Sequence, residues 1–225
     1  MAQGVYGTAG TGEERGEEMK YIILCGSNHA LINGTPRQLV KIGGERVLDR
    51  TIRLLRENGI TDISITATDP AFDGVDAEVI HYDSAGPWIN CFPPIDEPTT
   101  FIFGDVYFSH DAIETIVNTH TDDIEFFASA PPFAPEYPRI WAEPFAFRVV
   151  NLAHFRESIE IVKQCTEQGI WRRDPIAWEL WQVIKGTPLN MIDYSNYTVI
   201  NDYTCDIDYA DDVQMLEEVL GYGKA

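Results

Sequence analysis

The sequence predicts an α/β fold: a mixed, mostly parallel sheet with helices on both faces. Residues 20–67 read as strand, helix and strand, which favours a parallel pair of strands with a right-handed crossover. Residues 100–104 form a further, fully apolar strand that stops at Gly104 and Asp105. With 225 residues, of which 44% are hydrophobic, the chain can bury the full core of one such domain.

The start of the chain differs in composition from the rest. Residues 1–18 are rich in Gly, Glu and Thr and nearly devoid of apolar side chains, so we expect a disordered tail. Residues 19–225 contain no repeat and no linker, so we expect them to form one domain. Met19 directly precedes the first strand and is our hypothesis for the physiological start. A native mass that includes residues 1–18 would reject it.

The first half of the domain alternates short apolar runs with turn residues. Gly26 ends the first strand, and Gly59 stops the first helix, whose apolar residues share one face. Prolines and glycines make the segment before the fourth strand irregular. The expected elements are a strand at 20–25, a loop at 26–36, a turn at Gly43-Gly44, a helix at 45–58, strands at 62–67 and 77–82, an irregular segment at 83–100 and a strand at 100–104.

The second half follows the same logic. Ser109 can cap a helix, and Trp178 and Trp181 have the i,i+3 spacing of one helix face, where we expect them to be core residues. The expected elements are a helix at 110–119, a strand at 123–130, one or two strands within 140–150, helices at 151–167 and about 174–185, a strand at 197–201 and a helix at 210–220.

Charge and composition exclude several classes of partner. The formal net charge is −20, from 36 acidic and 16 basic residues, so the chain repels nucleic acid and anionic membranes. No apolar run approaches the roughly 20 residues of a membrane span, and the first 19 residues lack the apolar core of a signal peptide. The four cysteines lack CxxC spacing, which argues against a zinc site or disulfide framework and favours a reducing, cytoplasmic location.

Asp105 is the strongest candidate for chemistry. It directly follows an apolar strand, and ligands of open α/β sheets bind at the carboxyl ends of the strands. A carboxylate there can hold Mg²⁺, which is often bound by one or two carboxylates together with phosphates. The alternative is an aspartate that only turns the chain after the strand.

Asp206 and Asp208 are the second candidate. Residues two apart in an extended segment point to the same side, so both carboxylates could face one cation. The alternative is that acids before a helix favour its dipole, an interpretation that fits Asp211 and Asp212 better.

The loop after the first strand is a candidate phosphate site. A buried strand that opens into a loop ending in a cation, here Arg37, commonly holds nucleotide phosphates. Arginine offers a planar fork that is never neutral near pH 7. Ser27 and Asn28 can offer backbone N–H groups, whereas His29 and Lys41 have ordinary surface interpretations.

The acceptor side is harder to read. Residues of irregular or junction segments could line a second pocket, and a basic spot among them could receive an acceptor phosphate. The alternative for that spot is a helix start packed by its tryptophan. The residues are Asp83, Trp88, Asn90, Trp171, Arg172 and Arg173.

Four segments together resemble the nucleotidyltransferases that join a nucleoside triphosphate to a sugar phosphate or alcohol phosphate and release pyrophosphate. The resemblance covers about residues 20–220 in order and spacing. The family's loop carries several glycines and an internal arginine where this chain has residues 27–30, and the family's lysine is Arg37 here. The segments are Ile22-Ile23-Leu24-Cys25-Gly26, Pro36-Arg37-Gln38-Leu39, Phe103-Gly104-Asp105-Val106 and Asp206-Ile207-Asp208.

The resemblance implies a single-domain, Rossmann-like fold of the nucleotide-diphospho-sugar transferase type, Mg²⁺ as cofactor, and a triphosphate and a small phosphorylated acceptor as partners. A homo-oligomer stays open. Two other functions stay open as well: a metal-dependent glycosyltransferase, whose Asp-x-Asp motif Asp206 and Asp208 match formally, and an inactive nucleotide-binding relative. The implied site residues are Arg37 and Asp105 for catalysis; Leu24, Cys25, Gly26, Ser27, Asn28, Arg37 and Gly104 for the nucleotide; and Asp105, Asp206 and Asp208 for the metal.

Overall fold

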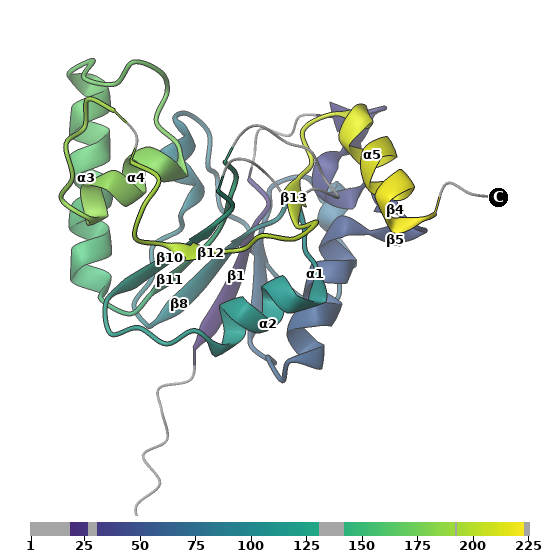
Figure 1. Ribbon diagram of the computed structural model, residues 1–225. Helices are drawn as coiled ribbons and strands as arrows, with labels where there is room; N and C mark the ends of the chain where they lie inside the picture. Colours follow the sequence, from purple (N-terminus) through teal and green to yellow (C-terminus); the bar gives the residue numbers. More distant parts are fainter. Residues whose placement is uncertain (1–18, 27–30, 131–141, 192, 223–225) are drawn as a thin grey trace, which may run out of the picture.

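A computed structural model describes residues 19–26, 31–130, 142–191 and 193–222. It has one seven-stranded mixed sheet with helices on both faces, which confirms the predicted class (Figure 1). The expected tail, residues 1–18, and the loop residues Ser27, Asn28 and His29 lie outside the described residues.

The sheet has the order β12-β10-β11-β8-β1-β6-β7. In its centre β1 pairs in parallel with both β6 and β8, so these three strands end at the same edge of the sheet. β11 runs antiparallel to both of its neighbours, β8 and β10. The strands are β1 (Lys20–Leu24), β6 (Ile63–Thr66), β7 (Glu78–Ile80), β8 (Thr99–Phe103), β10 (Ile124–Ala128), β11 (Pro144–Val149) and β12 (Thr198–Val199).

The helices form two layers around the sheet. α1 packs on α2 along one face, and α3 packs on α4 along the other (Figure 1). None of the helices in the described part of the chain is long and apolar enough to cross a membrane. The helices are α1 (Val47–Glu57), α2 (His110–Asn118), α3 (Leu152–Glu167), α4 (Ala177–Ile184) and α5 (Ala210–Leu220).

The segment expected as a loop at 26–36 contains a small hairpin instead, and a second hairpin follows it. Asn33 and Gly34 both have positive φ, as the tight turn of a two-residue hairpin requires, and so do Gly43 and Gly44. The short strands are β2 (Leu31–Ile32), β3 (Thr35–Pro36), β4 (Lys41–Ile42), β5 (Glu45–Arg46), β9 (Val106–Tyr107) and β13 (Cys205–Asp206), and the 3₁₀ turns are η1 (Arg37–Leu39), η2 (Pro70–Phe72) and η3 (Trp88–Cys91).

Two helix starts lie later than expected. α1 begins at Val47 because the two preceding residues pair in the hairpin of β4 and β5. α4 begins at Ala177 rather than near 174, since Pro175 disfavours the helical conformation in the residue before it.

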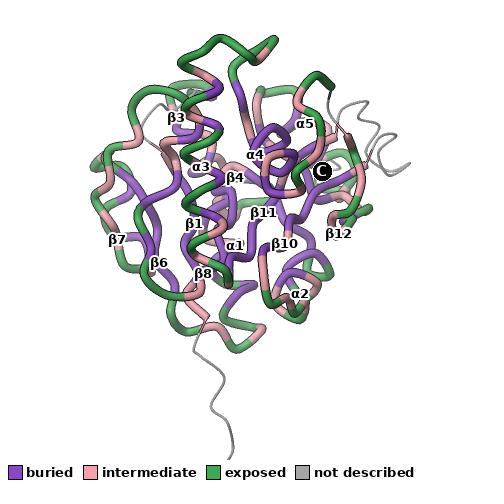
Figure 2. Tube along the Cα trace, turned by 90° about the vertical axis from the view of Figure 1, so that its left-hand side faces the viewer, coloured by how far each residue is buried: buried purple, intermediate pink, exposed green. Residues whose placement is uncertain are grey.

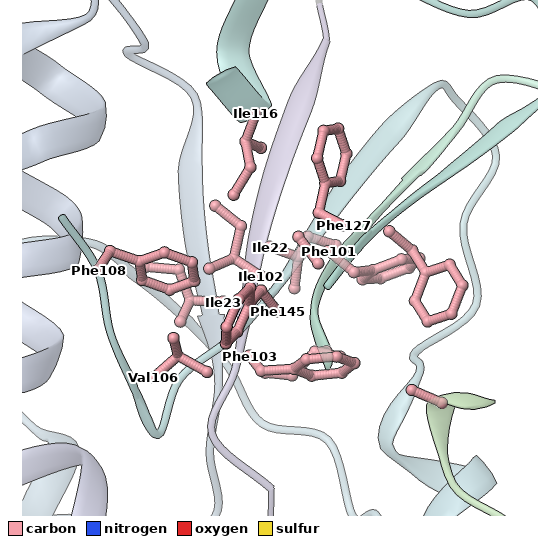
Figure 3. Close-up of a cluster of buried hydrophobic side chains, with 14 of the residues drawn as sticks. Ile22, Ile23, Phe101, Ile102, Phe103, Val106, Phe108, Ile116, Phe127 and Phe145 are labelled. Atoms are coloured by element: carbon pink, nitrogen blue, oxygen red, sulfur yellow. The ribbon is translucent and has the colours of Figure 1, made fainter. Parts of the chain in front are cut away.

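The core is continuous around the middle of the sheet. Figure 3 shows Ile22 and Ile23 of β1 among the phenylalanines of β8, and all five residues of β8 are buried. In Figure 2 buried chain runs through the sheet, while α3 turns an exposed face outward. Trp178 and Trp181 are buried as predicted, each within 5.6 Å of the Phe126 ring. This packing fixes the strand ends from which the site is built.

Candidate active site

The site begins where β1 and β8 end side by side. The Gly104 N–H donates to the Leu24 carbonyl at 3.0 Å. A Cβ at Gly104 would lie 2.9 Å from both the Cys25 Sγ and that carbonyl oxygen, so only glycine fits without a shift. Glycine therefore lets β8 exit against β1 and places Asp105 beside the first loop.

A distant segment completes this edge. β13 pairs antiparallel with β9, and the Ile207 N–H donates to the Asp105 carbonyl at 2.9 Å. Ile207 is fully buried, whereas Asp206 and Asp208 both face a cavity at the end of the sheet. The two carboxylates thus share one side, as their spacing predicted, and they lie in the same cavity as Asp105.

The cavity has a volume of about 390 Å³, within the range of small-molecule sites. Gly104 does not line it and instead packs beneath its wall. The sequence-predicted residues that the structure brings together around it are Leu24, Cys25, Gly26, Arg37, Asp105, Asp206 and Asp208.

Arg37 lies between the proposed metal ligands. The η1 turn places its guanidinium with Nε 3.1 Å from Asp105 Oδ2, and its Nη1 donates to Asp208 Oδ1. Burial lowers the pKa of Arg37, but Asp105, Asp206 and Asp208 together raise it above its ordinary value. The predicted phosphate cation and the predicted metal carboxylates are therefore paired with one another.

The surroundings of Asp206 shift its pKa strongly. Burial and the charges of Asp105 and Asp208 raise its pKa well above the usual range, although Arg37 acts in the opposite direction. Glu143, which no sequence pattern singled out, adds to this rise and accepts a hydrogen bond from the Asp206 N–H at 2.9 Å. Three acids thus act on Arg37, and Glu143 acts on one of them, Asp206.

This donor set fits a divalent cation. Carboxylate oxygens are the ligands that Mg²⁺ prefers, and a single guanidinium leaves the cluster with excess negative charge. Among the described residues, a different trio has its potential ligand atoms within 4.8 Å of one another: His110, Asp111 and Glu114, all exposed on α2. In the cavity, Asp105 and Asp208 both contact the Arg37 guanidinium.

The residues expected to bind the nucleotide differ in part from that expectation in their hydrogen bonds. The Cys25 N–H is already bonded to the Thr66 carbonyl at 3.2 Å and to Thr66 Oγ1 at 3.3 Å, so it does not offer a donor to phosphate. Burial and Asp105 also raise the pKa of the Cys25 thiol. Gly26, with φ of +70°, has the left-handed backbone that favours glycine and turns the chain away from β1.

Gln38 is a site residue to which no sequence pattern assigned a role. Its Nε2 donates to the Cys25 carbonyl at 3.0 Å, whereas its buried Oε1 has no hydrogen-bond partner among the described residues. The side chain lines the cavity, where a ligand N–H or O–H could satisfy this acceptor. A polar residue next to the predicted cation was the available signal.

Of the acceptor candidates, only Trp88 lines this cavity, with its ring 5.7 Å from the Phe103 ring. Asp83 and Asn90 both bond to the Ala85 backbone and shape a turn. The expected basic spot lies on a separate hollow, lined by Trp171, Arg172 and Arg173.

Two other candidate residues, Arg173 and Asp212, have structural roles. Arg173 pairs with the buried Glu179 at 2.9 Å, so it belongs to the start of α4, as the alternative interpretation held. Asp212 accepts hydrogen bonds from the N–H groups of Asp208 and Tyr209 at the start of α5. The helix-start interpretation is confirmed for Asp212.

Comparison with solved structures identifies the fold. No protein-family model matches the sequence, and no curated protein matches it. Among solved structures, the chain is similar to a Bacillus anthracis protein assigned as a glucose-1-phosphate thymidylyltransferase: 15% identity, 89% of this chain and 94% of that chain covered, and a TM-score of 0.54. It is also similar to the inositol-1-phosphate CTP transferase from T. maritima: 14% identity, 93% and 98% covered, and a TM-score of 0.51.

A third similar structure comes from Mycobacterium sp. strain JC1 and is a homolog of a Mycobacterium tuberculosis protein. It shares 18% identity, with 91% of this chain and 98% of that chain covered and a TM-score of 0.52. At these identities the likeness establishes the fold, which is that of the nucleotide-diphospho-sugar transferases, over nearly the whole chain.

Proposed function

We propose that this protein is a nucleotidyltransferase, which joins a nucleoside triphosphate to a small phosphorylated acceptor and releases pyrophosphate. The observation that carries the proposal is the convergence of Arg37, Asp105, Asp206 and Asp208 on one cavity. These residues come from three segments far apart in the sequence, and they meet at the strand ends where α/β sheets bind ligands. The similar structures with named activities are a thymidylyltransferase and a CTP transferase.

The reaction asks the chain mainly for positioning and for control of charge. In it, an oxygen of the acceptor phosphate attacks the α-phosphorus of the triphosphate, and the bond to the pyrophosphate breaks. Arg37 can present its planar fork to the oxygens of the departing pyrophosphate. Gln38, held by the Cys25 carbonyl, can accept a hydrogen bond from the nucleoside.

A metal ion belongs to this proposal. Asp105 and Asp208, with Asp206, are the residues that would hold Mg²⁺. When bound, the ion would offset the negative charge on the phosphates. The apolar side of the cavity, which includes Trp88 and Phe103, excludes water from one wall of the site and strengthens these charge interactions.

The test is release of pyrophosphate. The purified chain is incubated with Mg²⁺, each common nucleoside triphosphate in turn, and a panel of sugar 1-phosphates and alcohol phosphates. The proposal expects acceptor-dependent pyrophosphate with one triphosphate. Release of a nucleoside diphosphate from nucleotide sugars would identify the glycosyltransferase alternative instead, and no turnover of any triphosphate would favour the inactive relative.

A further inference from the structure

The position of Arg37 has a consequence for how ligands enter the cavity. Its guanidinium contacts Asp105 Oδ2 at 3.1 Å and donates to Asp208 Oδ1, and these oxygens are the ones that a cation would coordinate. The contact is largely shielded from solvent, because 22% of the Arg37 side chain and 21% of the Asp105 side chain are exposed. Arg37 is thus a counter-ion of these carboxylates.

A divalent cation and this guanidinium cannot use the same oxygens. Mg²⁺ binds carboxylate oxygens at about 2.0–2.1 Å and demands near-octahedral geometry, so Arg37 has to leave before the ion can bind both carboxylates. Among the described residues that line the cavity, the one other carboxylate is that of Asp206, which belongs to the same set of proposed metal ligands. A displaced guanidinium therefore needs a new anion, and the polyphosphate of a nucleotide supplies one.

Building on the proposed function, we propose that Arg37 is an internal competitor of the divalent cation, which keeps metal binding weak until a triphosphate draws the guanidinium away. Metal and triphosphate then bind cooperatively, since each makes the release of Arg37 from the carboxylates less costly for the other. Arginine suits this role because one planar fork can bridge two carboxylates, which the point charge of a lysine does not.

The test measures metal binding alone, without turnover. Free Mn²⁺ is followed by electron paramagnetic resonance while the full-length chain is titrated in the absence of nucleotide. We expect Arg37→Gln to bind Mn²⁺ about tenfold more tightly than the wild type, within the usual range of coupling between sites. Arg56→Gln is the matched control, because it removes the same charge from an exposed arginine that pairs with Asp76 at the end of α1. It should leave the Mn²⁺ affinity unchanged.

A second variant tests whether the more tightly bound Mn²⁺ lies at the proposed site. In the Arg37→Gln, Asp208→Asn double variant the tighter Mn²⁺ binding should disappear, because a ligand of the proposed site is lost. A gain that survives in the double variant would place the ion elsewhere, for example at the exposed trio on α2, and would overturn the proposal. Equal or weaker Mn²⁺ binding by Arg37→Gln would also overturn it.

A substitute variant and a separate activity assay make the outcome interpretable. If Arg37→Gln does not fold, Arg37→Lys takes its place: it keeps the charge but bridges less well, so it should bind Mn²⁺ more tightly than the wild type, and weaker binding would contradict the proposal. The pyrophosphate assay on the wild type reports separately on the function. If the wild type turns over but Arg37→Gln shows no gain in Mn²⁺ affinity, the competitor role alone is rejected. If Arg37→Gln gains Mn²⁺ affinity but the wild type shows no turnover, the transferase function is rejected.

Discussion

Asp105 owes its place to the residue before it. Gly104 allows the end of β8 to lie against the Leu24 carbonyl, and the next side chain then reaches the cavity. The sequence could predict this placement, because an apolar strand followed by glycine and aspartate marks the end of a parallel strand. It could not predict that Arg37 pairs with Asp105 and Asp208, since these contacts depend on a pairing between β9 and β13 that is only two residues long.

We predict that Asp105→Asn reduces turnover about a hundredfold or more, because removing one preorganised charge from an active site typically costs this much. The melting temperature should change little, since asparagine is nearly isosteric and Arg37 retains its contact with Asp208. Pyrophosphate release and thermal melts check the two parts. Asp111→Asn, on the exposed first turn of α2, is the control for the charge change. Retained activity in Asp105→Asn would reject the assignment.

We predict that Asp206→Asn stabilises the metal-free protein at neutral pH. The folded state raises the pKa of Asp206, mainly through burial and then through the neighbouring carboxylates, so it binds a proton more tightly than the unfolded chain does. The wild type therefore loses stability as the pH rises above the unfolded pKa of about 3.9, and this loss stops growing once the folded pKa is passed. Asparagine carries no such penalty, and its amide can donate to the nearby carboxylates.

The measurement is the difference in melting temperature between Asp206→Asn and the wild type, with a chelator present. The difference should be positive at pH 7 and should shrink as the pH is lowered toward the unfolded pKa of about 3.9, below which the wild-type carboxyl becomes neutral in both states. A variant that is less stable at pH 7, or a gain independent of pH, would contradict this account of the acid cluster.

At the scale of helices and strands, the pattern of apolar residues predicted the bounds of an element well wherever the element was long. One strand, β11, lies inside the expected range 140–150, and the other main strands and α2, α3 and α5 lie within two residues of their expected bounds. The two-residue strands β2 to β5 are too short to carry a periodic pattern, although Asn33-Gly34 was a turn signal that favours a hairpin. This matters for the site, because η1 follows that hairpin and presents Arg37 and Gln38 to the cavity.

The junction of β1 and β8 gives a prediction at this scale. Gly104→Ala should lower the free energy of unfolding by about 1–3 kcal/mol, because the added methyl group meets a backbone carbonyl that cannot move without disturbing the strand pair. Denaturant unfolding measures this. Adding Cys25→Ala removes the sulfur contact but not the carbonyl contact, so it should restore only part of the loss. Full restoration would show that the backbone contact is not the cause.

At the scale of the whole molecule, parallel topology gathers the site. β1, β6 and β8 end at one edge, and the chain returns about a hundred residues later to lay β13 beside β9 above it (Figure 1). Order along the sequence therefore predicted which segments meet. It did not predict that the basic spot at Trp171, Arg172 and Arg173 lies on a separate hollow, because the position of α4 depends on how it packs against α3.

The most direct test of the central claim is a thermal-shift screen of the wild type with each nucleoside triphosphate, with and without Mg²⁺. A ligand that binds only the native state at a hundredfold excess over its Kd adds about 2.7 kcal/mol, on the order of 5–10 °C for a chain of this size. We predict such a shift with one triphosphate, dependent on Mg²⁺ and lost in Asp105→Asn. No shift with any triphosphate, or an equal shift in Asp105→Asn, would contradict a metal-dependent nucleotide site at this cavity.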